Sequence, residues 1–168
     1  MKGIQAFFQS LDSTERTEVS LSYLGVDKER FQAGVTRNNL EIICASPGFL
    51  QTAEFARRCR TAAVNTYIGA SHFNFHHKFL ELLAVDRPVL VCPRESEESR
   101  RLSLLVPGAL IEAQNVQQVS DALVRVYNNW RTKTPEEDTA KALMTFSWRA
   151  QAQKLEQALT DAARAKYG

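Results

Sequence analysis

YIGASHFNFHHKFLELLAVDRPVLVCP, residues 67–93, contains the end of one strand, a loop, a helix, a tight turn and a buried strand. Four apolar residues of this stretch recur at helical spacing: Phe75, Phe79, Leu82 and Leu83. They predict a helix over 74–84 that turns one face toward a core. The run at 88–92 is short, apolar and β-branched, which is typical of a strand covered on both faces. Between the two, Asp86 stands where a helix often closes in the left-handed conformation.

One charged residue interrupts the apolar pattern of this helix. Glu81 lies beside the apolar stripe and near the helix start. The carboxyl ends of parallel strands are where open α/β sheets bind their ligands, and the helix follows such a strand end. Glu81 is therefore a candidate ligand-binding residue, and a solvated helix charge is the alternative.

The rest of the chain alternates between runs with helical spacing and short runs with the apolar pattern of a strand. Short apolar or alternating runs predict strands at 18–25, 39–45, 62–68, 88–92 and 109–112. Runs with helical spacing predict further helices at 3–11, 28–35, 52–59, 116–127 and 138–165. The last of these helices is predicted to be interrupted near 145–148. After Trp148 it is expected to extend from the domain or to wrap back along it. Helices that alternate with short apolar strands predict a mostly parallel sheet in a three-layer α/β/α sandwich. We expect one domain over residues 1–168.

Composition limits the class of protein. The formal net charge of the 168-residue chain is only +2, which does not favour nucleic acid as a partner. The N-terminus lacks the pattern of a signal peptide, and no apolar run has membrane-spanning length. Three cysteines, Cys44, Cys59 and Cys92, have no metal-like spacing and are interpreted as free thiols in a reducing compartment. We therefore expect a cytoplasmic protein with no transmembrane segment, no metal and no cofactor.

Several segments resemble one known family. Leu80-Glu-Leu-Leu-Ala84, followed by Pro88-Val89, is similar to the L-E-A-x-A-x-G-x-P-V segment of glycosyltransferases with the GT-B fold. Lys2-Gly3 and Phe146-Ser-Trp148 match the same family in the right order. The chain thus resembles the C-terminal, nucleotide-sugar-binding domain of the retaining, bacterial group 1 type. The resemblance implies a Rossmann-like half of a GT-B fold and a nucleotide-sugar as substrate.

The resemblance also implies a set of binding residues. Glu81 matches a glutamate that accepts hydrogen bonds from the ribose hydroxyls of the donor, and Lys2 matches the phosphate lysine. Gly48 and Phe49 stand where the family contacts the nucleotide base. His72 is a candidate contact to a donor phosphate or sugar hydroxyl, and a partly exposed polar residue at a helix start is the alternative.

The chain departs from the family at three places. Phe73 occupies the position of the family's first motif glutamate, and it cannot accept hydroxyls or act as a base. Residues 93–99 take the place of a glycine-rich loop but contain no glycine, which predicts a solvated loop and helix start. The family's opening strand, its arginine and its acceptor domain have no counterpart before Lys2. No catalytic residue is therefore assigned, and the isolated domain is expected to be inactive.

Three hypotheses follow. The first is the donor-binding domain of a glycosyltransferase, active only with an N-terminal acceptor-domain chain. The second is a non-catalytic binding or assembly module, and the third is half of a GT-B-fold sugar-nucleotide epimerase. Without a first strand, the strands at 18–25 and 62–68 must pair directly, or the chain must borrow a strand or be unstable. We therefore expect aggregation or a homodimer.

Overall fold

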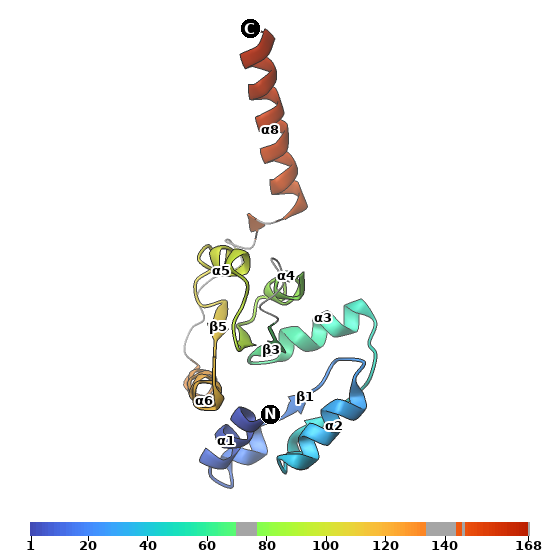
Figure 1. Cartoon of the computed structure of the whole chain (residues 1–168), viewed down its shortest axis with the longest axis vertical. Helices are drawn as coiled ribbons and strands as arrows, with labels where there is room; N and C mark the ends of the chain where they lie inside the picture. Colours follow the sequence, from blue (N-terminus) through green and yellow to red (C-terminus); the bar gives the residue numbers. More distant parts are fainter. Residues whose placement is uncertain (70–76, 134–143, 146, 168) are drawn as a thin grey trace.

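The computed structural model describes residues 1–69, 77–133, 144–145 and 147–167 (Figure 1). Its α-helices are α1 (Lys2–Ser10), α2 (Lys28–Arg37), α3 (Thr52–Thr61), α4 (His77–Leu83), α5 (Glu97–Ser103), α6 (Val116–Arg131) and α8 (Trp148–Tyr167). Its strands are β1 (Leu21–Ser22), β2 (Cys44–Ala45), β3 (Asn65–Ile68), β4 (Val89–Cys92) and β5 (Leu110–Glu112). Each strand lies inside a run that the sequence predicts as a strand, so the mixed α/β class is confirmed.

The strands form two small sheets. One holds β1 and β2, and the other holds β3, β4 and β5 in that order. Every pairing is parallel, as predicted. In the ranges that the structure describes, β1 does not pair with β3. Direct pairing of the two predicted strands, which was one expected way of closing the sheet, is therefore not what the chain does.

The first two strands are much shorter than the sequence predicts. In place of long strands at 18–25 and 39–45, the chain forms 3₁₀ turns at Glu15–Glu18 and Glu41–Ile43, followed by two-residue strands. Alternation of apolar residues reports which side chains are buried, whereas a strand also needs a hydrogen-bonding partner along its edge. Among the described residues, β1 and β2 pair only with each other, over two residue pairs.

The largest cluster of buried residues among those described lies around α4 and β4, as the stretch 67–93 predicts. Phe79 is fully buried and lies in one cluster with Leu82 and with Val89 of β4. Asp86 adopts a φ of +58°, which confirms the left-handed turn between the helix and the strand. Its backbone amide donates to the carbonyl of Leu83 at 3.1 Å, which satisfies a carbonyl at the helix end.

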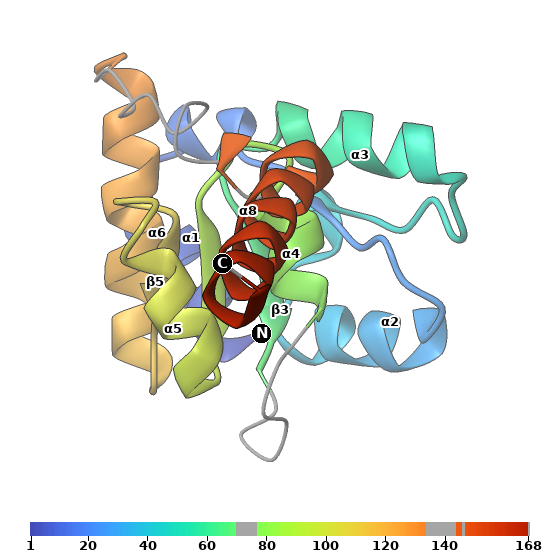
Figure 2. The same ribbon diagram turned by 90° about the horizontal axis from the view of Figure 1, so that it is seen from above.

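Helices α1 and α6 lie side by side (Figure 2). The rings of Phe7 and Tyr127 meet edge to face with their centroids 6.1 Å apart. At Gly3 a Cβ atom would stand 2.5 Å from the Cβ of Val119, so only glycine lets the two helices approach this closely. The glycine that the sequence placed beside a phosphate lysine therefore has a packing role of its own.

The last helix leaves the body of the molecule. α8 extends away from the sheets and the other helices (Figure 1), and residues 151–166 are all exposed. It follows the first of the two paths expected for this segment, extension from the domain.

Within the described ranges, no helix combines the length and the apolar character that a membrane crossing needs. The three cysteines are free thiols, and Cys59 is buried.

Candidate functional site

The carboxyl ends of β3, β4 and β5 carry a connected set of polar side chains. The hydroxyl of Tyr67 in β3 donates a hydrogen bond to the carboxylate of Glu95, which follows β4. The backbone amide of Glu95 donates to Oε1 of Glu112, the last residue of β5, at 2.9 Å. Arg100 of α5 reaches the other oxygen of Glu112 at 3.0 Å. We call these four residues the edge network.

Glu95 is the most enclosed acidic residue of this network, with only 5% of its surface exposed. A buried carboxylate needs hydrogen-bond donors to replace the water it loses. Tyr67 supplies one, and the backbone amide of Ser96 supplies another at 2.7 Å. The carboxylate is therefore held by the protein itself and is not presented to a ligand.

The loop after β4 ends in a helix cap. The hydroxyl oxygen of Ser96 accepts a hydrogen bond from the backbone amide of Ser99 at 3.2 Å, which starts α5. Ser96 and Ser99 are both buried, and their hydroxyls are 2.9 Å apart. The sequence predicted a solvated loop at 93–99. The helix start is confirmed, but the prediction of solvation is wrong for Glu95, Ser96 and Ser99, which are buried. Glu95 has partners from distant segments, Tyr67 and Glu112, whereas Ser96 and Ser99 hydrogen-bond to each other.

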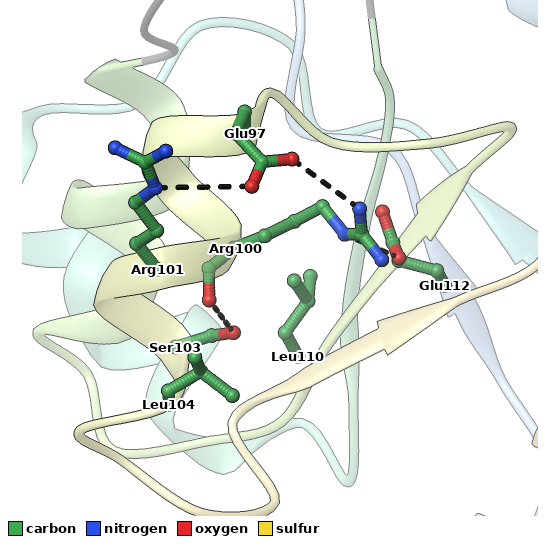
Figure 3. Close-up of a pocket in the computed structure, with 7 residues that line it drawn as sticks. All are labelled: Glu97, Arg100, Arg101, Ser103, Leu104, Leu110 and Glu112. Carbon is green, nitrogen blue, oxygen red and sulfur yellow. Dashed lines mark hydrogen bonds and ion pairs between the residues drawn. The ribbon is translucent and has the colours of Figure 1, made fainter.

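A small open pocket of about 350 Å³ lies between α5 and β5 (Figure 3). Its lining residues are Glu97, Arg100, Arg101, Ser103, Leu104, Leu110 and Glu112. Figure 3 shows Glu97 between the two arginines and Arg100 extending from α5 to Glu112. Nη1 of Arg100 lies 3.5 Å from Glu97, and Nε of Arg101 lies 3.7 Å from it. Two carboxylates therefore balance two guanidinium groups, and the pocket offers no net charge to an anion.

Glu81, the main residue that the sequence singles out, lies in the second turn of α4. Its side chain is exposed, whereas its neighbours Leu82 and Leu83 are buried. The carboxylate pairs with Nζ of Lys78 one turn earlier, and the ammonium of Lys78 also lies 5.1 Å from the ring centroid of Phe55. Surface ion pairs of this kind contribute about 0–1 kcal/mol, so a ligand can displace Lys78 from the carboxylate at little cost.

Of the other predicted residues that are described, Lys2 and Phe49 are exposed, Gly48 is half-buried, and they lie apart from Glu81. Lys2 is the first residue of α1. Gly48 has a φ of +82°, as expected in a Pro-Gly turn, and Phe49 after it is 80% exposed. The loop with these two residues runs from β2 to α3 at the periphery, whereas α4 lies near the centre of the molecule (Figures 1 and 2). No hydrogen bond or ion pair within the described ranges joins Lys2, this loop and Glu81.

Two residues of the predicted site fall outside the described ranges. His72 and Phe73 belong to the segment 70–76, and nothing follows for their roles. Among the residues that the structure does describe, no group of three or more histidine, cysteine, aspartate and glutamate side chains is placed to hold a metal ion.

Sequence reasoning missed the edge network. A signal was present, since Tyr67 and Glu112 stand in or at the end of predicted strands and Glu95 closely follows another. Parallel strands bring their carboxyl ends to one edge, so polar residues at these positions are expected to meet. The acidic character of the loop at 93–99 favoured a solvated interpretation instead.

Comparison with known proteins assigns no family to this chain. No family model matches the sequence, and no curated protein matches it significantly. The functional conclusion therefore rests on the residues and their arrangement.

Proposed function

We propose that this chain is the donor-binding domain of a glycosyltransferase, a Rossmann-like half of a GT-B fold that binds a nucleotide-sugar. The observation that carries the proposal is the position of Glu81. It is an exposed carboxylate on the helix after β3, and that helix is anchored by the buried side chains of Phe79, Leu82 and Leu83. The confirmed helix–turn–strand order over 77–92 supports the resemblance from which the role of Glu81 comes.

The chemistry of Glu81 suits the proposed role. An ionised carboxylate only accepts hydrogen bonds, and its two oxygens match the two vicinal hydroxyls of a ribose. In the donor complex the hydroxyls take the place of the Lys78 ammonium on the carboxylate. Lys2 supplies a positive charge for the phosphates, and Phe49 supplies an exposed ring against which a base stacks. His72 is a further contact for a phosphate or a sugar hydroxyl.

The domain is proposed to act together with an acceptor domain, carried by another chain or by the rest of a longer protein. Isolated, it binds the donor without transferring the sugar. We place it in the cytoplasm, because its three free thiols suit a reducing compartment.

Calorimetry with uridine, guanosine and adenosine diphosphates tests this proposal. Loss of a hydrogen bond to a charged group costs about 1.5–3 kcal/mol, so Glu81→Gln is expected to weaken binding about 10- to 150-fold. Glu156→Gln is the matched control, because Glu156 is an exposed helix glutamate on α8. Equal affinity of the wild-type chain and Glu81→Gln would show that Glu81 is only a surface charge.

A non-catalytic binding or assembly module is the second candidate, and the edge network favours it. The resemblance implies a glycine-rich loop with a glutamate after β4, whereas the loop at 93–99 has no glycine and its carboxylates would repel the phosphates of a donor. Here the loop is fixed from within, because Glu95 and Ser96 are buried and hydrogen-bonded. On this alternative none of the three nucleotides binds the wild-type chain in calorimetry.

A further inference from the structure

α8 presents an apolar face that no part of the described structure covers. The helix leaves the body of the molecule (Figure 1), and residues 151–166 are all exposed. Trp148 is 93% exposed, and Leu155 and Leu159 are 61% and 63% exposed. None of these three side chains belongs to a hydrophobic cluster among the described residues. Because most helices in proteins are stabilised by the packing of an apolar face, this face is a candidate interaction surface.

The apolar residues of α8 follow the period of a coiled coil. They recur in alternating steps of four and three residues along the helix: Trp148, Ala152, Leu155, Leu159 and Ala162. Helices that pair side by side carry apolar residues at this spacing. We call this row of residues the α8 stripe.

The side of α8 opposite the stripe is polar. At about 100° per residue, Lys154, Asp161 and Arg164 lie away from the α8 stripe. On that side Gln157 donates a hydrogen bond to Asp161, one turn further along the same helix, at 2.8 Å. α8 thus has one face for water and one face that fits a second helix of the same period.

Two opposite charges flank the α8 stripe on one side. Arg149 directly follows Trp148 and Glu156 directly follows Leu155, so both charges lie on the same edge of the stripe, about two turns apart. In the part of the chain that is described, neither Arg149 nor Glu156 forms an ion pair. Ion pairs at such flanking positions set the choice and the orientation of a partner helix. An edge with one positive and one negative charge complements a copy of itself that runs in the opposite direction.

Two antiparallel copies of α8 can bring their stripes together about a two-fold axis. Trp148 of each copy then lies opposite Leu159 of the other copy. In the middle of the pair, Ala152 of each copy lies opposite Leu155 of the other copy. The large side chains of one helix therefore meet apolar side chains of the other throughout residues 148–159.

The flanking charges select this register. In it, Arg149 of each copy lies beside Glu156 of the other copy, which gives two ion pairs related by the two-fold axis. A shift by one heptad in either direction places Glu156 beside Glu156 of the other copy, or Arg149 beside Arg149. In a parallel pair, Glu156 lies opposite the uncharged Gln151 and gains no ion pair. Charge complementarity thus favours the antiparallel pair.

We propose that α8 pairs with α8 of a second copy of this chain, as an antiparallel coiled coil over residues 148–159. An overlap of about three turns is short for a coiled coil, so the dimer is weak and the chain is monomeric when dilute. The proposal goes beyond donor binding and does not depend on it, because it uses no residue of the proposed donor site.

Sedimentation velocity of the full chain over a series of concentrations tests the pairing. We expect a dimer that forms as the concentration rises. Arg149→Glu and Glu156→Arg each place like charges side by side in both pairs, and each is expected to raise the dissociation constant about tenfold. The double variant Arg149→Glu/Glu156→Arg exchanges the charges and is expected to restore the wild-type association. Since the two residues lie about two turns apart, this restoration cannot arise within one helix.

A substitution in the α8 stripe and a matched one outside it locate the contact. Leu155→Asp is expected to abolish the dimer, whereas Gln153→Asp, on the exposed outer side of the same helix, leaves it intact. A chain that stays monomeric at every concentration, or equal effects of these two variants, overturns the proposal. A double charge variant that fails to associate also overturns it. A dimer that neither single charge variant weakens does the same, since a parallel pair or another surface then joins the two copies.

Discussion

Removal of the Tyr67 hydroxyl should destabilise the chain far more than removal of a comparable hydroxyl elsewhere. In Tyr67→Phe the buried carboxylate of Glu95 loses one of its hydrogen-bond donors while the aromatic ring stays in place. A hydrogen bond to a charged group contributes about 1.5–3 kcal/mol, and an unsatisfied buried group costs its full desolvation penalty. For a domain of this size, a loss of 1 kcal/mol lowers Tm by about 2–4 °C. We therefore expect a decrease in Tm of about 3–12 °C.

The matched control for this prediction is Tyr23→Phe. The Tyr23 hydroxyl accepts a hydrogen bond from the backbone amide of Asp27 at 3.1 Å, in an exposed position where water replaces it. Its loss should cost less than about 0.5 kcal/mol, as is usual for surface substitutions. Urea denaturation followed by circular dichroism measures both free energies of unfolding. If the two variants lose the same stability, the edge network does not hold Glu95 in the way described.

Two further predictions concern the core and the two surface ion pairs of Glu54. Phe79→Ala should lower the free energy of unfolding by about 3–5 kcal/mol, because it empties a fully buried position. The control Trp148→Ala, on the exposed start of α8, should change this free energy little. Equal losses for the two variants in urea denaturation would place Phe79 outside the core. Hydrogen bonds from Arg57 and Arg58 lower the pKa of Glu54 to about 2, below the usual value of about 4.3, so the stability from these pairs is present above about pH 4.3 and is lost as the pH falls through about 2. A carboxyl carbon NMR titration of Glu54 with a midpoint near 4.3 would contradict this pairing.

The sequence predicts best where one local pattern determines the structure. The spacing of Phe79, Leu82 and Leu83 sets the buried face of α4, and Asp86 marks its end without any help from distant residues. The strands at 18–25 and 39–45 were predicted too long, because alternation does not show whether an edge has a partner. The extent of β1 depends on β2, which lies more than twenty residues later.

In the candidate site too, features set by a local pattern could be predicted from the sequence, and features set by distant residues could not. The exposure of Glu81 follows from the helical period of its segment, and the exposure of Phe49 follows from the Pro-Gly turn that precedes it. The burial of Glu95 could not be predicted locally, because its partner Tyr67 lies 28 residues earlier and Glu112 lies 17 residues later. Only the meeting of three strand ends turns an acidic loop into an enclosed network.

The central claim is that a nucleotide-sugar donor binds at Glu81, and NMR of the ¹⁵N-labelled chain tests it most directly. Titration with the nucleoside diphosphate that binds best in calorimetry should shift amide signals of α4 around Glu81 first. Signals of the loop at Gly48 and Phe49 and of the start of α1 should follow the same saturation curve. Shifts confined to the pocket between α5 and β5, or no saturable shifts with any of the three nucleotides, would contradict the account.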